Sequence, residues 1–584
     1  MYLATLLLAS LTMFDSAVPV GTKISNITFK DIRYLPRTLD DFKEKKAVVL
    51  VFVDKSCPVA QKYLPVLQEM DKQFSGKGIQ FLAINPSPDD SIVEMAGQAV
   101  ALNITFPFVK DFGGKAAKSL GVDRVPTVVI LNDQRVIVYR GRVDDAVRLG
   151  GTRKEPTRKD LQIALEEVLA GKPVTTAETV VDGCAITFAE EAANAQPVNF
   201  AEHVEPIIRK HCMDCHKTGT VAPFTLLNYE QVKAKAATIA EVVREERMPP
   251  WYGHPEFGKF VNKRGMTDKE RETILAWIKQ GKPSGDLTKV PEVPADYNLP
   301  NEWIITKPDL ILSTGSYDLP ASGDIDYKYA ILPYVFAQDT WVQEIQIKPE
   351  NNKLVHHANL AYFVVGEKFN MDTFLTGYVP GGIPMRLEPG VAIKIGKGSV
   401  LGLQIHFVST GKPEKGKVSV GLKFAQGELK KQLHFHLFVD NRFAIPPEAT
   451  AYPVSASWTA PDDIIGVGLF SHMHLRGKDM SFFAAKPQQE KEQLLMVPNY
   501  SFDWQIGYAW PVGLMKFPQG TKFDCIAHFD NSTFNPYNPN PKATVREGQQ
   551  THQEMMNGFF FYVKEKENLG YQLEGSTGRV KASK

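Results

Sequence analysis

The chain has 584 residues, 43% of them hydrophobic and 23% charged, so it is long enough for several globular domains. Its 67 basic and 66 acidic residues leave a formal net charge of +1, which argues against nucleic acid as a partner. Five cysteines are too few for a disulfide-dense scaffold. This composition excludes a disordered, fibrous or multi-span membrane chain.

The first 17 residues predict a signal peptide. An apolar run over 2–14 precedes Ser16-Ala17, a small-residue cleavage site, and is too short for a comfortable membrane span. The run is not preceded by Lys or Arg, so an uncleaved N-terminal anchor is the alternative. Because no later stretch has 18 consecutive apolar residues, we expect an exported protein, periplasmic or extracellular, with no integral membrane body.

Residues 18–172 alternate between strand and helix patterns. Continuous apolar runs at 48–53 and 79–84 are typical of buried parallel strands, and the segment 59–74 between them has helical spacing. A strand pair over 127–140 closes the pattern. The sequence therefore predicts an α/β domain.

This domain resembles a thioredoxin-like redoxin through the residues around Cys57-Pro58 and through Val125-Pro126-Thr127. The resemblance implies that Pro126 is a cis-proline beside Cys57. The partner-cysteine position holds Ala60, so Cys57 has no dithiol partner in the motif, and Asp54 replaces the peroxiredoxin threonine. Two interpretations stay open: an inert or docking domain, and a one-cysteine redox role in which Cys57 is catalytic, as in a thiol peroxidase.

The stretch 173–197 is rich in small and polar residues and is predicted to be a linker. It contains Cys184, which we interpret as structural or free.

Residues 198–290 contain the motif Cys212-Met213-Asp214-Cys215-His216. Two thiols at this spacing can form thioethers to haem, and the adjacent histidine can bind the iron. Met248, held between Arg247 and two prolines, is the predicted sixth ligand, and Met266 is the alternative. With its helical periodicity, the segment resembles an all-α class I cytochrome c; a structural zinc site or a redox cysteine pair is the other interpretation.

The region 300–572 is strand-rich, with alternating patterns such as 341–347 and 418–424 separated by Gly/Pro turns. Its length fits two jelly-roll units, predicted at 300–445 and 446–572 with a boundary near Pro446-Pro447. The predicted fold class is therefore multidomain: an α/β thioredoxin-like domain, an all-α cytochrome c and an all-β double jelly roll.

Nine of the 13 histidines lie in this last region, and some fall in suggestive groups. His472 and His474 are two residues apart, so a strand would place them on one face. His356 and His357 are adjacent and can share a metal only if the strand bulges or ends there. A pair of histidines on a strand is by itself more often a packing feature than a ligand set.

The order of the groups resembles the copper type II, ascorbate-dependent monooxygenases, such as peptidylglycine α-hydroxylating monooxygenase. The resemblance implies two copper ions, one in each jelly roll, with Met555 (or Met556) as a thioether ligand. It implies that the first copper takes electrons, and that the second binds O₂ and abstracts hydrogen from a C–H bond, with Met555, His472 and His474 as catalytic residues. The predicted copper ligands are His356, His357 and His406 for the first ion, and His472, His474 and Met555 for the second.

Departures from that family bear on the substrate. Phe470 replaces an arginine before the second histidine pair, and Phe559 replaces a tyrosine two residues after Asn557. Partners for a peptide carboxylate are thus reduced, and glycine-extended peptides are an unlikely substrate. Cys525 has no local mate, so the family's disulfides are missing. The remaining histidines of the region are interpreted as structural or second-layer residues: His434, His436, His528 and His552.

The motifs together predict an exported oxidoreductase with one covalent haem c and two copper ions. Its expected partners are O₂, an external electron donor and an unidentified small-molecule or peptide substrate. A haem on the same chain would be an electron carrier at high effective concentration. The alternatives are a non-catalytic electron-transfer or copper-binding protein, and a thiol peroxidase acting through Cys57.

Overall fold

The computed structural model describes residues 18–148, 151–152, 155–188, 197–220, 222–294, 303–323, 325–367 and 373–581. The predicted signal peptide at 1–17 lies outside these ranges. Within them, we find no helix that is both long and apolar enough to cross a membrane. The chain divides into two compact units, Met1–Ala193 and Asn194–Lys584, and each is described by itself.

The N-terminal unit is built on a seven-stranded sheet with the order β2-β1-β5-β4-β3-β7-β8. β3 and β4 are parallel and fully buried, as their continuous apolar runs predict, and β7 and β8 continue the sheet antiparallel. The strands are β1 (Thr28–Asp31), β2 (Pro36–Thr38), β3 (Ala47–Phe52), β4 (Ile79–Asn85), β5 (Phe108–Lys110), β7 (Thr127–Asn132) and β8 (Ile137–Gly141). The predicted α/β domain is confirmed.

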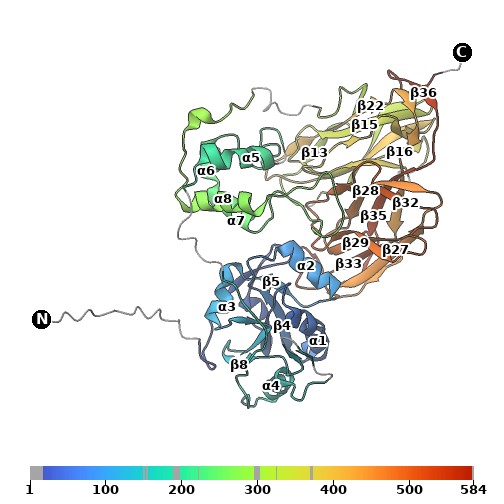
Figure 1. The fold of residues 1–584 in the computed structure, drawn as a ribbon. Helices are drawn as coiled ribbons and strands as arrows, with labels where there is room; N and C mark the ends of the chain where they lie inside the picture. The colour runs from blue at the N-terminus through green and yellow to red at the C-terminus, as the bar shows by residue number, and fades with distance from the viewer. Residues whose placement is uncertain are drawn as a thin grey trace. The chain divides into compact units, whose positions relative to one another are not determined.

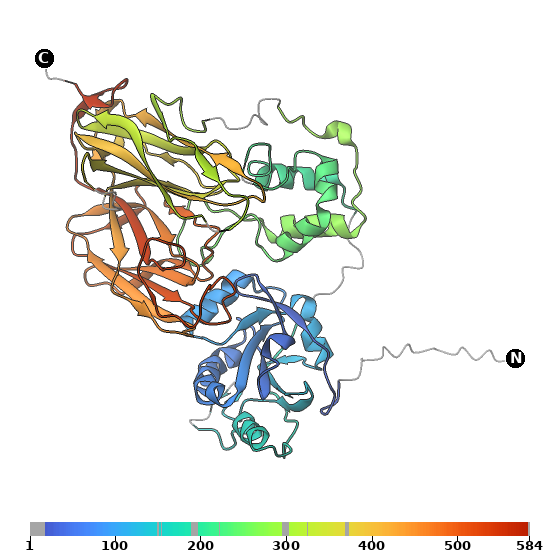
Figure 2. The same cartoon turned by 180° about the vertical axis from the view of Figure 1, so that it is seen from behind.

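Helices lie around this sheet, as Figures 1 and 2 show. α1 follows β3 directly and buries Leu64, Leu67 and Phe74. α2 begins at a capping box in which Ser91 and Glu94 satisfy each other's backbone N–H groups. The helices are α1 (Pro58–Phe74), α2 (Ile92–Ala101), α3 (Lys115–Ser119) and α4 (Asp160–Leu169).

The second unit begins with a helical segment. Its described residues between 198 and 290 form helices and loops around a core that contains Phe200, Ile274 and Trp277. Thr267 caps α8 and forms a capping box with Glu270. The α-helices are α5 (Glu205–His211), α6 (Tyr229–Ala234), α7 (Ala236–Arg244) and α8 (Asp268–Lys279).

The first β-sandwich packs a sheet of order β12-β22-β15-β19-β24 against a sheet of order β14-β20-β16-β17. Side chains of both sheets, such as Ile345 and Leu403, share one core. The strands are β12 (Leu310–Ser313), β14 (Lys328–Phe336), β15 (Thr340–Pro349), β16 (Val355–Val364), β17 (Phe374–Tyr378), β19 (Val391–Ile395), β20 (Ser399–Phe407), β22 (Val418–Phe424) and β24 (Lys431–Gln432).

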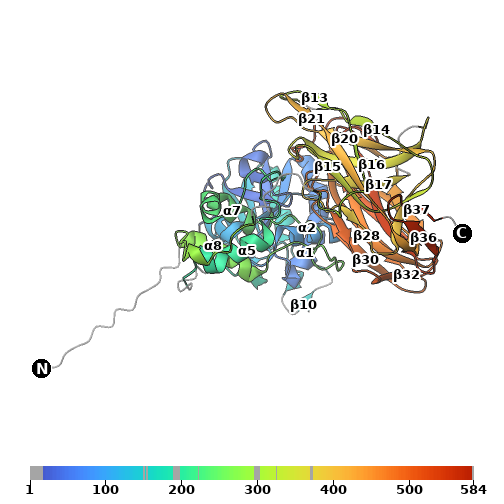
Figure 3. The same ribbon diagram turned by 90° about the horizontal axis from the view of Figure 1, so that it is seen from above.

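The second β-sandwich pairs a sheet of order β25-β35-β28-β31 with a sheet of order β27-β33-β29-β30. Phe523 and Phe560 pack across the two sheets with ring centroids 4.7 Å apart. Figure 3 shows the strands of this sandwich in orange to red beside the yellow strands of the first. The strands are β25 (His434–Val439), β27 (Tyr452–Thr459), β28 (Ile464–His472), β29 (Gly477–Ala485), β30 (Lys491–Val497), β31 (Gly507–Ala509), β33 (Lys522–Phe529) and β35 (Asn557–Lys564).

The predicted all-β C-terminal region is confirmed. The division within it falls earlier than the expected 445/446, because β25 already pairs with β35 of the second sandwich. Pro446-Pro447 is a turn inside that sandwich: the preceding strand β26 (Ala444–Ile445) pairs with β34 (Val545–Arg546).

Candidate functional site

The first histidine group lies on two paired strands of the first sandwich. His356 and His357 begin β16, and His406 lies near the end of β20, directly opposite His357 in the register. The register shifts between Val355 and His357, which places a bulge at His356. The predicted requirement that the strand bulge at this pair is confirmed.

The ring nitrogens of this group converge. One ring nitrogen from each of the three histidines lies within 4.8 Å of the others. His356 Nδ1 and His357 Nδ1 are 3.2 Å apart. Two nitrogens each about 2.0 Å from one tetrahedral metal would be about 3.3 Å apart. His406 Nδ1 is buried and has no hydrogen-bond partner, so all three rings fit a shared metal ion.

The second group lies in the second sandwich. His472 is the last residue of β28 and pairs with Asn557, the first residue of β35. Met555 precedes β35 by two residues, and its Sδ lies 3.5 Å from Nδ2 of Asn557, the strand partner of His472. The Glu554 carboxylate accepts the backbone N–H groups of both Met555 and His474, at 3.2 and 2.9 Å, which ties Met555 to this group. Met555 is 8% exposed and His474 1% exposed.

Glu554 fixes the turn that carries His474 relative to Met555. Its fully buried carboxylate accepts the backbone N–H groups of His474 at 2.9 Å and Arg476 at 2.6 Å. Burial raises the pKa of Glu554 to about 7, and these hydrogen bonds oppose the rise. Sequence reasoning missed this role of Glu554. The signals that could have indicated it are an acidic residue directly before the predicted ligand Met555 and a basic residue, Arg476, close after His474.

Hydrogen bonds set which nitrogen of each ring is free. His472 Nδ1 is 2.7 Å from Gln505 Oε1, and His474 Nδ1 is 3.2 Å from the Gln553 carbonyl, so each ring donates there and keeps the lone pair on Nε2. His356 Nε2 is 3.1 Å from Asp503, which leaves its Nδ1 free. Such outer partners orient the ligands of metal sites.

Burial lowers the pKa of His357 and His474 well below the usual value, and neighbouring histidines add to this effect. The rings are therefore neutral at pH 7, which is the form that binds metals. His357 Nε2 and His474 Nε2 are both buried and unpartnered. A buried polar atom without a partner lowers the free energy of unfolding by about 1–3 kcal/mol. A metal ion bound to His474 Nε2 would remove this cost.

The two groups adjoin each other. The ring centroids of His357 and His472 are 6.0 Å apart. Phe502 stacks on His356 at 4.7 Å and lies 6.2 Å from the His474 ring. Tyr327, which is 6% exposed, packs on His406 at 4.8 Å. The predicted ligand sets are thus brought together into one aromatic-lined cluster, hereafter the histidine cluster: His356, His357, His406, His472, His474 and Met555.

The donor set of the histidine cluster fits copper. Imidazole nitrogens with one thioether suit an ion that cycles between Cu(I) and Cu(II). The other histidines of this region have roles in the scaffold. His436 stacks on Trp458, His528 bonds Asp479 at 2.6 Å, His434 faces Glu567 and the His552 carbonyl accepts from Arg476.

The Cys-x-x-Cys-His motif lies at the end of α5. His216 Nδ1 is 3.0 Å from the Phe224 carbonyl, which leaves Nε2 as the free nitrogen. Burial raises the pKa of Cys212 to about 12 and also raises that of Cys215, which weighs against a reactive thiol pair here. Met266 packs against the same helical core as Cys212, whereas Met248 is half-buried in the loop after α7.

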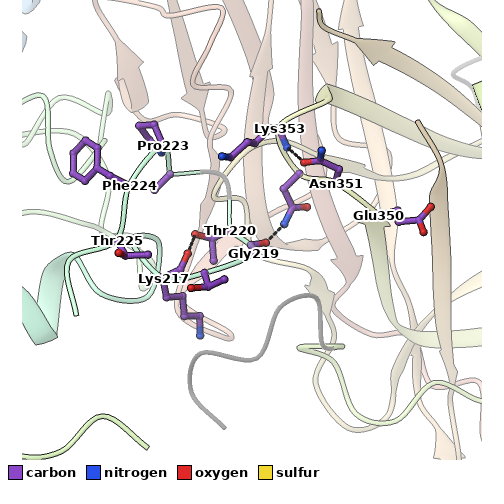
Figure 4. A pocket seen from close by; sticks show the side chains of 12 residues that line it. Lys217, Gly219, Thr220, Pro223, Phe224, Thr225, Glu350, Asn351 and Lys353 are labelled. Carbon is purple, nitrogen blue, oxygen red and sulfur yellow. Dashed lines mark hydrogen bonds between the residues drawn. The ribbon is translucent and has the colours of Figure 1, made fainter. Parts of the chain in front are cut away.

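A pocket of about 280 Å³ follows this motif (Figure 4). One wall is formed by residues 217–220 and 222–225, and the other by the turn 350–353, which precedes His356. Asn352 Nδ2 donates to the Gly219 carbonyl at 2.6 Å across it. The motif loop therefore contacts the strand connection that leads into the histidine cluster.

The segment after Met248 also packs on the second sandwich. Trp251 contacts Tyr508 with ring centroids 5.1 Å apart, and Asn262 bonds the backbone of Gly507 and Ala509 at 2.7 and 3.0 Å. Arg264 donates to the Gly381 carbonyl at 2.6 Å. The helical segment is thus attached to β31, the short strand that follows the loop carrying Phe502, Asp503 and Gln505.

The thiol site lies in the N-terminal unit. Cys57 is 1% exposed at the start of α1, and its Sγ is 3.5 Å from the carbonyl of Val125, whose peptide bond to Pro126 is cis as predicted. Asp54 accepts the Cys57 backbone N–H and thereby caps the helix start. Cys57 has no partner thiol within its motif, as predicted, but a thiol from outside the motif lies near it: Cys184 is the strand partner of Val125, whose carbonyl oxygen is 3.5 Å from Cys57 Sγ. The sequence places Cys184 in a predicted linker, but in the structure Cys184 and Ala185 pair as a short strand with Val125 and Arg124 of the domain.

Sequence reasoning also missed the supporting residues of the histidine cluster. Phe502, Asp503 and Gln505 lie in a loop with no periodicity, and Tyr327 is far from every histidine in the sequence. No single-sequence signal indicates them.

Known proteins resemble the N-terminal unit. The family model described as Redoxin matches residues 19–156. Thiol-disulfide oxidoreductase ResA of Bacillus thuringiensis subsp. konkukian is 26% identical over 124 residues, which are 21% of this chain and 70% of that protein. ResA of Halalkalibacterium halodurans is 25% identical over 123 residues, 21% of this chain and 68% of that protein.

Among solved structures, the hypothetical protein SMc02350 from Sinorhizobium meliloti 1021 is 27% identical with a TM-score of 0.29, covering 30% of this chain and 98% of that one. The N-terminal unit contains a thioredoxin-like redoxin domain, a fold of thiol oxidoreductases.

Proposed function

We propose that the chain is an exported oxidoreductase that hydroxylates a C–H bond with O₂, using two copper ions and a covalent haem c as electron relay. The observation that carries this proposal is the histidine cluster, in which ring nitrogens of His356, His357 and His406 lie within 4.8 Å of one another and the His472 ring adjoins that of His357. His356, His357 and His406 would hold one copper ion. His472, His474 and Met555 would hold the other.

The chain's own residues prepare this site. Copper, when bound, would supply one-electron redox chemistry and O₂ activation. Asp503, Gln505 and the Gln553 carbonyl hold the imidazoles in the tautomers that present free nitrogens. Phe502 packs among the rings and reduces the access of water to them.

The substrate side of the second group is apolar. Phe470 and Phe559 lie two residues from His472 and Asn557, hence on the same strand faces, and their rings are 5.7 Å apart. These are the positions at which the resembled family has an arginine and a tyrosine. The site is therefore better suited to an apolar substrate than to a carboxylate.

Cys212 and Cys215 would hold haem covalently and His216 would bind its iron, which would supply one-electron redox chemistry. The hydrogen bond to the Phe224 carbonyl orients the His216 ring for this role. Met248 remains the proposed second iron ligand. Met266 is the alternative ligand, because it packs against the same helical core as Cys212.

The test is the number of copper ions per haem in protein matured with haem and then loaded with copper. We expect about two, and each of H406A and H472A should lose about one. H436Q is the matched control, because His436 is in the same region but stacks on Trp458. Haem without tightly bound copper would refute the proposal and favour the electron-transfer alternative.

The haem ligand is tested separately. M248A should abolish the sulfur-to-iron absorption band of the oxidised haem, and M266A should preserve it. The opposite pattern would assign the ligand to Met266. Since neither methionine belongs to the histidine cluster, copper content should stay unchanged in both variants.

A further inference from the structure

We propose that Cys57 and Cys184 form a reversible dithiol–disulfide couple within the N-terminal unit. This couple is separate from the copper and haem chemistry proposed above. It gives the redoxin domain the second thiol that its motif lacks, supplied from a segment about 130 residues further along the chain.

The segment that carries Cys184 is held on the domain at several points. Thr179 donates its backbone N–H to Arg140, and its hydroxyl lies 2.9 Å from that of Tyr139. Further on, β11 (Cys184–Ala185) pairs antiparallel with β6 (Arg124–Val125), and Ile186 donates to the Asp123 carbonyl at 2.8 Å. We call the stretch 177–188 the strap.

Close packing fixes the register of the strap at its centre. A Cβ on Gly183 would lie 2.0 Å from the Val125 carbonyl oxygen, so only glycine allows this approach. Arg124 donates to the Gly183 carbonyl at 3.2 Å. At the far end, the Phe188 ring covers Gly114 and lies under the Lys118 ammonium group.

This register places the two thiols together. Val125 is the strand partner of Cys184, and its carbonyl oxygen is 3.5 Å from Cys57 Sγ. Burial, together with the neighbouring Cys57 thiol, raises the pKa of Cys184 to about 12, so Cys184 is protonated at pH 7. Both cysteines are free thiols in the structure.

The two sulfurs differ in accessibility. Cys57 is 1% exposed, whereas Cys184, near the centre of the strap, is half-buried. An external thiol can therefore reach Cys184 and not Cys57. In the oxidised couple, Cys184 is the sulfur that is attacked and Cys57 is the leaving group.

The oxidised couple can take two electrons from a small dithiol in two exchange steps. A thiolate of the dithiol attacks Cys184 Sγ, the Cys57–Cys184 bond breaks, and Cys57 leaves and takes up a proton. The second thiol of the dithiol then attacks the mixed disulfide, forms a cyclic disulfide and releases Cys184 with a proton. Two electrons pass from the dithiol to the protein, and oxidation of the couple is the reverse reaction with a cyclic disulfide.

The experiment equilibrates the full haem-loaded chain in buffers of reduced and oxidised dithiothreitol, quenches with acid, alkylates the free thiols and maps peptides by mass spectrometry. We expect a linked Cys57–Cys184 peptide whose fraction rises with the oxidised share. C525S is the control and should titrate like the parent, because Cys525 is buried in the other unit. No linked peptide at any ratio would overturn the proposal.

Two variants test the geometry. C57S should trap glutathione on Cys184, and C184S should trap at least about tenfold less on the buried Cys57. G183A should lower the equilibrium constant for disulfide formation about tenfold or more, because the added methyl group displaces the strap. Equal trapping in C57S and C184S, or an unchanged constant in G183A, would contradict the proposed arrangement.

Discussion

Replacing Gln505 by leucine should weaken copper binding at the second histidine group more than D503N weakens it at the first. Each residue accepts a hydrogen bond from a ring nitrogen of a proposed ligand. Gln505 Oε1 is 2.7 Å from His472 Nδ1, and Asp503 Oδ1 is 3.1 Å from His356 Nε2. They differ in environment: Gln505 is 2% exposed, while the Asp503 side chain is 66% exposed.

The magnitudes follow from this difference. Loss of a partner that orients a metal ligand costs about 10–100-fold in affinity, which is about 1.4–2.8 kcal/mol. The buried Gln505 should give a value in this range, because water cannot replace it. An exposed charge pair contributes about 0.2–1 kcal/mol, so D503N should cost less than about fivefold.

The assay is competition for Cu(I) with a chromophoric chelator, on haem-loaded protein in which the other site is disabled by H406A or H472A. Thermal unfolding of each variant reports whether the leucine also disturbs the fold, since it leaves His472 Nδ1 without a partner at a cost of about 1–3 kcal/mol. Q505E, which keeps an acceptor, should retain most of the affinity. A larger loss in D503N than in Q505L would refute the reasoning.

Three further outcomes are expected. M555A and M556A each truncate a buried methionine, so both should lose about 2–5 kcal/mol of stability. Only M555A should abolish copper-dependent O₂ consumption, whereas M556A should keep its copper. Full turnover in copper-loaded M555A would contradict the ligand role. Burial raises the pKa of Asp71 to about 6, so the folded unit holds this proton more tightly than the unfolded chain and its stability falls as the pH rises from about 4 to above 6. D71N should remove this pH dependence and raise the free energy of unfolding at pH 8 by at most about 3 kcal/mol. Chemical denaturation of the N-terminal unit measures this change. An unchanged pH profile in D71N would count against the role of Asp71. F502A should leave the number of bound copper ions unchanged but give water more access to the histidine rings. NMR should then show faster proton exchange at the His356 and His357 side chains. An unchanged exchange rate would contradict the shielding role of Phe502.

Sequence patterns predicted those features that local chemistry determines. The apolar runs of β3 and β4 indicate buried parallel strands, and the adjacent pair His356-His357 requires the bulge that the register shows at this point. The cis peptide bond before Pro126 follows from the redoxin resemblance. In each case the information lies within a few residues.

Features that depend on long-range pairing could not be predicted. Cys184 lies in a stretch of small polar residues that is typical of a linker, and only its pairing with Val125 brings it to Cys57. Likewise, Gln505 lies in an irregular loop, where its sequence position says nothing about His472. The choice between Met248 and Met266 depends on how a loop folds over the helical core.

The segment 498–510, a loop that ends in β31, has a thermodynamic consequence. The loop residues Phe502, Asp503 and Gln505 contact both histidine groups, while Gly507 and Tyr508 of β31 contact the helical segment that carries the Cys-x-x-Cys-His motif. Two binding events that act on one shared element influence each other equally in both directions. If the proposed copper ions shift this segment on binding, copper loading would change the reduction potential of the proposed haem, and the oxidation state of that haem would change copper affinity by the same free energy.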